Sequence, residues 1–315
     1  MKNILIAVAS ILAVAASPAF AQWQPTAPIK MMIGFTPGGS ADTQARLMAE
    51  ELEARNGWKV IPESVLGKGG AVLAAKLKNE PADGTTIGMI VSETVDYSMI
   101  ADRNPGYTQH DFTYLVSTAG TQLGVVSTRA KGWNSMPDVV AAARQGETLR
   151  FGVMTPKLAD GAYLLGKSQG VDFNIVSFKG GKGVLDAIVA GDIDLGWVAG
   201  PQVRGVTAGD LVNLASGEAE RLDMSPSVPT IRELGFEQSL GMVFVFVAPK
   251  DLPADAKAAL TAAMAEILND PASKTNAYIT KLFGKPRVIS GEALDTYLAD
   301  SLDSARRLLA EADSQ

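Results

Sequence analysis

A glycine-rich segment, FTPGGSAD at residues 35–42, is the part of the sequence best suited to binding chemistry. It follows an expected strand and opens an expected helix. Gly38 and Gly39 allow the backbone to approach a ligand closely, and Ser40 can cap the helix. Because a helix N-terminus offers free N–H groups and a partial positive charge, the segment suits an anion. It also fits a capped helix without a ligand, in which Asp42 complements the helix dipole.

A second glycine-rich turn, GKGG at residues 67–70, repeats this arrangement one strand and one helix later. Two such turns in neighbouring units face the same edge of a sheet, which favours the binding interpretation over either turn alone. Neither turn is a nucleotide motif. Residues 35–42 lack the lysine of a phosphate-binding loop, and residues 67–70 lack a third glycine at the required spacing.

A third turn, FKGGKG at residues 178–183, ends an expected strand in the second half of the chain. It can present N–H groups from the opposite side of a cleft, or it is a flexible turn with solvated lysines. Trp197 lies near the end of another expected strand. That position fits the wall of a cleft, and it fits the core or its rim equally well.

Residues that could perform catalysis or bind a metal are scarce. The chain has 0 Cys and 1 His, His110, which excludes a thiol nucleophile and a multi-histidine zinc site. It contains no Gly-x-Ser-x-Gly elbow and no Ser-x-x-Lys pair, and no pair of carboxylates is distinguished by the sequence. The GDID turn at residues 191–194 has too few acids for calcium. We therefore expect a protein without catalysis, cofactor or metal.

Short apolar strands alternate with helical patterns along the chain, which predicts βαβ units with parallel pairing. The expected strands are residues 29–35, 59–62, 86–91, 123–127, 149–154, 174–178, 193–198, 211–215 and 242–248. The expected helices are residues 41–55, 71–78, 161–169, 183–190 and 254–268, and one after Gly291 with Leu294, Leu298, Leu302, Ala305 and Leu309 on one face. Residues 102–111 are expected to form a surface loop.

Two capping boxes predict further helices. Ser135 and Asp138 open one through residue 143, and Thr230 and Glu233 open a short one that ends at Gly235. Two α/β units followed by helices predict two lobes with a ligand cleft at the carboxyl ends of the strands.

The amino end predicts export. Residues 1–21 combine one lysine, a short apolar run and a small-x-small cleavage site, which is typical of a signal peptide cut between Ala21 and Gln22. A membrane anchor is the alternative, but the run is short for a bilayer. No cysteine follows it, so a lipoprotein is excluded.

Composition limits the remaining classes. The net charge is −6, and removal of Lys2 with the signal leaves −7; without a basic tract, nucleic acid is not an expected partner. Hydrophobic residues make up 47% of the chain, which fits a packed globule of this length without disulfides.

With these residues in view, the chain resembles the TctC (Bug) family of tripartite tricarboxylate transporter substrate-binding proteins from about residue 29 to its end. The resemblance lies in residues 35–42, in the turn at 67–70 with PADGT at 81–85, in FKGG at 178–181, in GDIDL at 191–195 and in VPTIRELG at 228–235. Their order and spacing are more specific than any one of them.

The resemblance implies a type II periplasmic binding protein, with two α/β lobes that close on a carboxylate held largely by backbone groups. It implies a periplasmic monomer that passes its ligand to membrane permease subunits. We expect lobe I to comprise residues 22–121 and 248–315, and lobe II residues 122–247. The expected ligand-binding residues are Phe35, Thr36, Gly38, Gly39, Ser40, Asp42, Gly69, Gly70, Met154, Thr155, Phe178, Lys179, Gly180 and Trp197.

The sequence also departs from the family pattern. Residues 63–70 read ESVLGKGG instead of a stretch with Asn-Arg-Pro, the second-lobe loop reads MTPK at 154–157, and Phe178 replaces the usual tyrosine. The ligand therefore stays open among citrate-like, dicarboxylate, amino and aromatic acids. A sensor module that serves a signalling partner is a second hypothesis, and a periplasmic hydrolase using carboxylates is a third.

Overall fold

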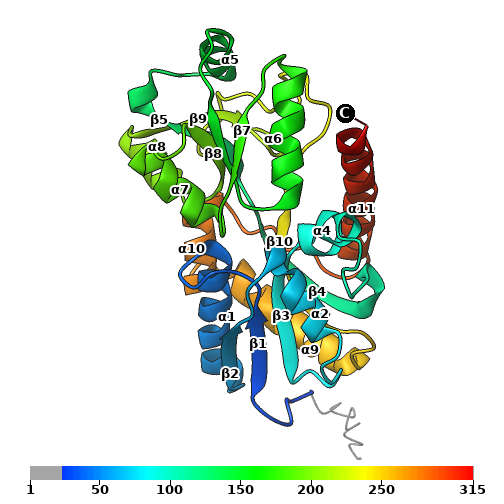
Figure 1. Cartoon of the computed structure of the whole chain (residues 1–315). Coiled ribbons are helices and arrows are strands. Elements are labelled where there is room, and N and C mark those ends of the chain that lie inside the picture. The colour runs from blue at the N-terminus through cyan, green and yellow to red at the C-terminus, as the bar shows by residue number, and fades with distance from the viewer. Residues whose placement is uncertain (1–22, 315) are drawn as a thin grey trace, which may run out of the picture.

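Two five-stranded sheets, each with helices on both faces, form two lobes stacked one above the other (Figure 1). The structure is a computed structural model that describes residues 23–314, so the expected signal peptide lies outside the described residues. No helix within residues 23–314 has the length and apolar character needed to span a bilayer.

The sheet of lobe I has the strand order β2-β1-β3-β10-β4. Its strands are β1 (Ile29–Ile33), β2 (Val60–Ser64), β3 (Thr86–Val91), β4 (Phe112–Gly120) and β10 (Val243–Pro249). β1 pairs in parallel with β2 and β3, whereas β10 runs antiparallel to β3 and β4. The expectation of uniformly parallel pairing is therefore wrong at β10, because this strand returns from the second lobe in the opposite direction.

The sheet of lobe II has the order β7-β6-β8-β5-β9. Its strands are β5 (Leu123–Thr128), β6 (Arg150–Val153), β7 (Asn174–Ser177), β8 (Leu195–Ala199) and β9 (Leu211–Ser216). β6 is parallel to β7 and β8, and β5 is antiparallel to β8 and β9. The chain enters this sheet after β4 and is back in the first sheet by Val243, earlier than the boundary expected between residues 247 and 248.

The helices cover both faces of each sheet. They are α1 (Ser40–Asn56), α2 (Ala71–Leu77), α3 (Ser92–Val95), α4 (Tyr97–Ala101), α5 (Met136–Arg144), α6 (Pro156–Ser168), α7 (Gly181–Ala190), α8 (Val203–Ala208), α9 (Ala254–Asn269), α10 (Lys274–Phe283) and α11 (Glu292–Asp313). Three short 3-10 turns join them: η1 (Lys68–Gly70), η2 (Gln109–Asp111) and η3 (Arg129–Lys131).

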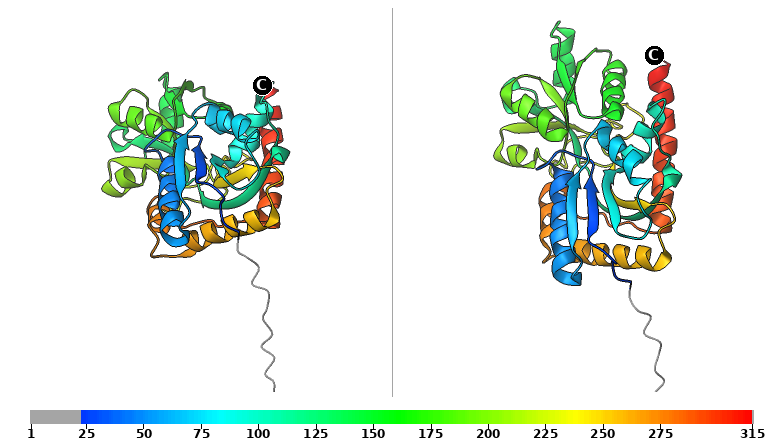
Figure 2. Two further views of the ribbon diagram at one scale, coloured as in Figure 1. Left: turned by 90° about the horizontal axis from the view of Figure 1, so that it is seen from below. Right: turned by 60° about the horizontal axis from the view of Figure 1, so that its bottom comes forward.

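Two long helices near the C-terminus pack against lobe I, and one of them also reaches lobe II. α9 lies across the base of lobe I and contacts α1 and β4 (Figure 2). α11 rises from lobe I past α4 and reaches α6 of lobe II (Figure 1). Its predicted apolar face is only partly confirmed: Leu294, Leu298 and Ala305 are buried, but Leu302 and Leu309 are half-buried and Leu308 takes a buried position instead.

The two predicted capping boxes have different outcomes. Ser135 and Asp138 cap α5 with reciprocal hydrogen bonds, as predicted. Thr230 and Glu233 make the same reciprocal bonds, at 2.8 and 3.1 Å, but residues 231–235 form turns and no helix. The prediction of a helix there is wrong, because Gly235, with φ +93°, ends the segment before a helical turn can repeat.

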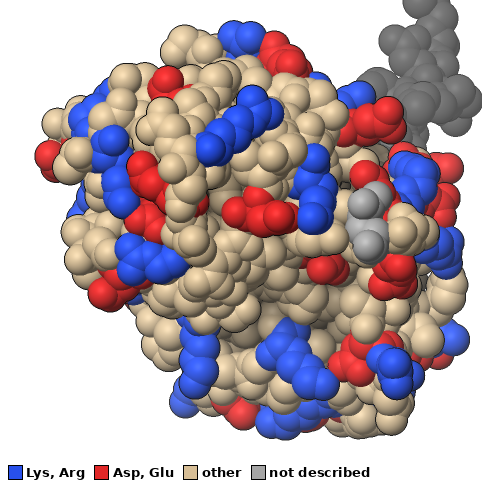
Figure 3. Space-filling model, turned by 45° about the horizontal axis from the view of Figure 1, so that its top comes forward, with Lys and Arg blue, Asp and Glu red and all other residues tan. Residues whose placement is uncertain are grey.

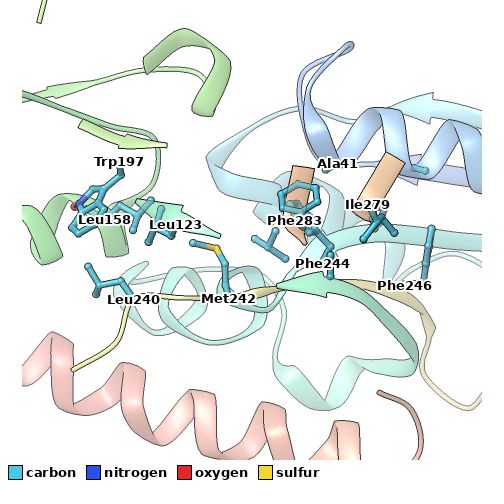
Figure 4. Packing of buried hydrophobic residues seen from close by; sticks show 14 of the residues in the cluster. Ala41, Leu123, Leu158, Trp197, Leu240, Met242, Phe244, Phe246, Ile279 and Phe283 are labelled. Atoms are coloured by element: carbon cyan, nitrogen blue, oxygen red, sulfur yellow. The ribbon is translucent and has the colours of Figure 1, made fainter. Parts of the chain in front are cut away.

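The core continues from one lobe into the other. Figure 4 shows Phe244 and Phe246 of β10 facing Ile279 and Phe283 of α10, with the Phe244 and Phe283 rings 5.3 Å apart. Met242 lies between this group and the Leu158, Trp197 and Leu240 group of lobe II (Figure 4). The segment that leads from lobe II into β10 therefore runs through packed side chains.

Asp194 fastens the start of β8 to its neighbours. Its side chain is 7% exposed and accepts hydrogen bonds from the backbone N–H of Arg150 at 2.8 Å, from the Arg150 Nε at 3.0 Å and from the Lys131 ammonium. Burial alone would raise the pKa of Asp194, but the bonds from Arg150 and Lys131 outweigh it and hold this pKa well below its usual range. The acidic GDID turn thus has a structural role.

Asp194→Asn is expected to lower the free energy of unfolding by about 1.5–3 kcal/mol at neutral pH, because it removes hydrogen bonds to a charged group. A carboxyl with a depressed pKa stabilises the fold above its ordinary value of 3.8, and the contribution is lost as pH falls through the lower folded-state pKa. Urea denaturation should therefore show a difference at neutral pH that becomes smaller as the pH is lowered below 3.8. The control is Asp172→Asn, whose side chain is 80% exposed in its pair with Lys167 and should have little effect.

Candidate ligand-binding site

A cavity of about 1710 Å³ lies between the lobes and is lined by residues from both. This volume exceeds the roughly 300–1,000 Å³ that is common for small-molecule sites. Its walls come from the loops after β1, β6 and β7, from η1, and from α8 and α10. Most are strand ends that open helices, the places where the sequence predicted anion-binding turns.

Most of the expected ligand-binding residues line this one cavity. Those that do are Phe35, Thr36, Gly38, Gly39, Ser40, Gly69, Met154, Thr155, Phe178, Lys179 and Gly180. The structure thus brings segments that are far apart in the sequence to a common space.

Three expected residues do not line the cavity. Asp42 is 2% exposed and accepts hydrogen bonds from the Gly38 N–H and the Arg46 Nε, each at 2.9 Å, so it holds the loop from behind. At Gly70 a Cβ atom would lie 2.7 Å from Oγ1 of Thr94, so its role is close packing. Trp197 is fully buried and donates from Nε1 to the Leu158 carbonyl at 3.1 Å.

The loop between β1 and α1 presents the start of a long helix to the cavity. Gly38 has φ +75°, a conformation that side chains other than glycine rarely adopt, and the Gly39 N–H donates to the Thr36 carbonyl at 3.0 Å. Gly39 precedes the first turn of α1, where no described side chain caps the helix. Ser40 and Ala41, the first residues of this 17-residue helix, line the cavity, so the positive end of the helix lies at its wall.

The loop between β7 and α7 presents a second helix start from lobe II. Gly180 has φ +90° and precedes α7, again without a capping side chain among the described residues. Gly181 and Lys182, the first residues of this 10-residue helix, line the cavity. The Thr36 hydroxyl reaches the Lys179 carbonyl at 3.5 Å, so the two loops meet across the cleft. Two helix N-termini from opposite lobes make a site for an anion.

Basic side chains add to this attraction. Lys68 and Lys182 line the cavity, but each is paired with a carboxylate, Asp102 and Asp186 respectively. Lys179, Arg204 and Lys281 line it too, and none of the three has an ion pair within residues 23–314. Although the protein carries a net charge of −6, this region is locally positive. On the face in Figure 3, by contrast, acidic and basic side chains are interspersed.

The inner wall of the cavity is apolar. It is formed by Val91 at the end of β3, by Met242 and Phe244 at the start of β10, and by Leu282 of α10. Tyr278 of α10 lies beside the Ser40 and Thr43 hydroxyls, and burial raises the pKa of its phenol. A ligand with a carboxylate at one end and a hydrocarbon body fits such a lining.

Sequence reasoning missed the contributions of α8 and α10. Arg204, Tyr278, Lys281 and Leu282 all line the cavity. Arg204 could have been predicted from one signal in the sequence. Gly200 and Pro201 follow β8 just before it, in the same way as the glycine-rich turns follow other strands. No comparable signal marks α10, which reaches the cavity only through its packing against α1.

The described part of the chain offers no cluster of metal-binding side chains. Within residues 23–314 no cluster of three or more His, Asp or Glu side chains could hold a metal ion. His110 lies exposed in η2 and does not line the cavity. The arrangement can hold an anion by hydrogen bonds and charge.

Comparisons with known proteins agree with this architecture. Among curated relatives, the protein BugT of Bordetella pertussis is 30% identical over 271 residues, covering 79% of this chain and 77% of BugT. A protein of Cupriavidus necator, from the gbd 5' region, is 29% identical over 255 residues. The match covers 78% of this chain and 76% of the Cupriavidus necator protein.

Two solved structures share the fold. A Rhodopseudomonas palustris protein with adipate has a TM-score of 0.81 and 23% identity, covering 92% of this chain and 98% of its own. The periplasmic binding protein BugD has a TM-score of 0.78 and 20% identity, covering 92% and 99%. The fold is therefore the two-lobe fold of periplasmic solute-binding proteins. Because residues 44–312 match the model of the tripartite tricarboxylate transporter family receptor, the chain belongs to the TctC family.

Proposed function

We propose that this protein is a periplasmic receptor that captures a small organic carboxylate between its lobes and delivers it to the permease subunits of a tripartite tricarboxylate transporter. The observation that carries the proposal is the pair of uncapped helix N-termini, α1 from lobe I and α7 from lobe II, at one cavity. N–H groups that approach from two sides can hold a carboxylate only when the lobes are together.

Two structural neighbours support the ligand class. One of the Rhodopseudomonas palustris proteins was solved with adipate, and another, MatC, with malate. The apolar wall formed by Val91, Met242 and Phe244 suits the hydrocarbon part of such an acid. The unpaired cations Lys179, Arg204 and Lys281 supply the charge attraction that an acidic protein otherwise lacks.

We further propose that each chain acts as a monomer, holds one ligand and releases it unchanged. Membership of a receptor family supports binding without turnover. The proposal includes export, with residues 1–21 removed before the protein reaches its ligand.

A thermal-shift screen of organic acids tests the proposal. Protein is taken from the periplasm, and its intact mass is checked for loss of residues 1–21. Adipate, malate, citrate, glutamate and benzoate are then added separately. An acid present at about 100 times its Kd should raise the free energy of unfolding by about 2.7 kcal/mol, because it binds only the folded state.

The matching amides of these acids are the control, because they lack the carboxylate and should give no shift. Mass spectrometry after incubation should recover the bound acid intact. A panel in which no acid raises the stability, or in which the protein consumes an acid catalytically, would contradict the proposal. Loss of uptake of the same acid in a strain lacking this protein would support delivery to a permease.

A further inference from the structure

A buried cluster of charged side chains joins the two lobes directly behind the cavity. Glu93 of α3 and Asp96, the cap of α4, belong to lobe I and are 1% and 0% exposed. Lys157 belongs to α6 of lobe II and is 5% exposed. Charged side chains are almost never buried unless they are paired, so this cluster requires an explanation.

The two carboxylates differ in their hydrogen bonds. Asp96 accepts from the Tyr97 N–H and from the Ser301 hydroxyl. Glu93 receives a long bond of 3.4 Å from the Ser98 hydroxyl at Oε1, and its Oε2 has no partner of good geometry among the described residues. The Thr155 hydroxyl and the Lys157 N–H of lobe II also point toward this carboxylate, and both favour its charged form. An ionised carboxylate left in this state costs free energy, whereas a protonated one loses its charge and gains a donor.

The cluster is connected to the ligand cavity on both sides. In lobe I, the Thr94 hydroxyl next to Glu93 donates to the carbonyl of Gly69, which lines the cavity, at 2.8 Å. In lobe II, Lys157 follows Thr155, which caps α6 and also lines the cavity. A Cβ atom on Gly69 would lie 3.8 Å from Cγ2 of Thr155, so the lobes touch there. A motion that separates Gly69 from Thr155 must also separate Glu93 from Lys157.

The charges of the cluster do not balance. The Lys157 ammonium acts on both carboxylates but lies within 4 Å of neither among the described residues, so the buried group carries one excess negative charge when all three are ionised. The other ionisable groups around it are Asp160 on α6, Tyr97 on α4, Tyr107 before β4, Tyr297 and Asp313 on α11, and the pair of Glu218 and Arg287. Glu218 has Arg287 and Lys157 nearby and accepts bonds from Thr121 and Leu123, and Glu218 and Arg287 together add no net charge to the cluster.

We propose that Glu93, Asp96 and Lys157 form a proton-linked contact between the lobes, in which one carboxyl of the pair takes up a proton as the lobes come together and releases it as they separate. A proton cancels the excess charge of the buried cluster. When the lobes separate, water reaches Glu93 and solvates its negative charge, so the carboxylate no longer requires a proton.

The direction of the pH dependence follows from the two states. Burial raises the pKa of Glu93 from its ordinary 4.5 to about 7, with Lys157 partly offsetting the rise, and burial also raises the pKa of Asp96. With the lobes apart, a solvated Glu93 titrates nearer its ordinary value. Contact between the lobes is therefore favoured by a bound proton between pH 4.5 and about 7, and this advantage is lost as pH rises through about 7. One proton changes the ratio of the two states by at most about tenfold per pH unit.

The experiment measures the separation of the lobes without any ligand, so its outcome does not depend on the proposed function. The chain has 0 Cys, so Glu53→Cys on α1 and Thr207→Cys on α8 introduce two exposed sites for spin labels, one on each lobe. Pulsed electron paramagnetic resonance should give shorter label separations at pH 5 than at pH 8. Glu93→Gln, which keeps the shape of a protonated carboxyl, should give the short separations at both pH values.

Two controls exclude other titrating groups. Glu63→Gln removes a carboxylate of the same lobe that is 44% exposed in its pair with Lys76, and it should keep the pH change of the parent protein. His110→Gln, at the single histidine of the sequence, should also keep it. Lys157→Met should move the midpoint to higher pH, because the two carboxylates lose their cation. Separations in the parent protein that do not change with pH, or a pH change that persists in Glu93→Gln, would overturn the proposal.

Discussion

Gly38→Val is expected to weaken carboxylate binding on the order of a hundredfold. Gly38 has φ +75°, and a β-branched residue cannot hold that conformation without strain. No atom lies within 4 Å of the position of a Cβ atom there, so the effect comes from the backbone. The loop must change shape, and the N–H groups at the start of α1 move away from the carboxylate. Hydrogen bonds to a charged group contribute roughly 1.5–3 kcal/mol each, and about 1.4 kcal/mol is tenfold in affinity.

The matched control for this variant is at the other end of the same helix. Gly57 ends α1 with φ +70° and also has nothing within 4 Å of a Cβ position. Gly57→Val should therefore cost similar stability and leave the Kd unchanged in titration calorimetry. Lys68→Ala should change the Kd by no more than about tenfold, because the Lys68 side chain is 70% exposed. Equal losses of affinity in the two glycine variants would show that binding depends on general stability and not on this loop.

Trp197→Ala is expected to lower the free energy of unfolding by about 3–5 kcal/mol, the cost of removing a large aromatic side chain from a core. Trp197 is fully buried, its ring lies 5.5 Å from that of Phe151, and its Nε1 donates to the Leu158 carbonyl at 3.1 Å. Chemical denaturation measures the change. A loss below about 1 kcal/mol would contradict a core role.

A milder variant separates the core role from contact with the ligand. Trp197→Phe keeps most of the packing and loses the bond to Leu158, so it should lose stability and keep the Kd of the parent protein. A large loss of affinity in folded Trp197→Phe would return Trp197 to the ligand-binding residues expected from the sequence.

Local patterns made much of the fold predictable. The run at residues 86–91 forms β3 with the predicted bounds, because an apolar stretch of 6 residues between turns is too short for a helix and favours a buried strand. β4 was missed because Ser117 and Thr118 interrupt its apolar pattern. The structure shows why they are tolerated: Ser117 exchanges hydrogen bonds with the Arg287 carbonyl and the Ile289 N–H, a pairing that depends on residues far along the chain.

In the site too, features set by short segments could be predicted, whereas features set by contacts between distant segments could not. The glycine turns could be predicted because conformational freedom and helix starts are properties of short segments. Trp197 was ambiguous because alternation along a strand decides which face a residue takes. Val198 faces the group around α7, and Trp197 faces the group around α6. The positions of Arg204 and Lys281 depend on how α8 and α10 pack, which no short pattern encodes.

The position of β10 has a consequence for the order in which the protein folds. β10 lies between β3 and β4 in its sheet, although it follows the whole of lobe II in the chain. Until β10 is added, β3 and β4 have no partner at their facing edges, and the first sheet consists of two separate pieces. Lobe II is built from one continuous stretch and has the lower contact order, so it should fold first. During synthesis, the first half of lobe I therefore has unpaired strand edges until β10, which is made late, can join the sheet.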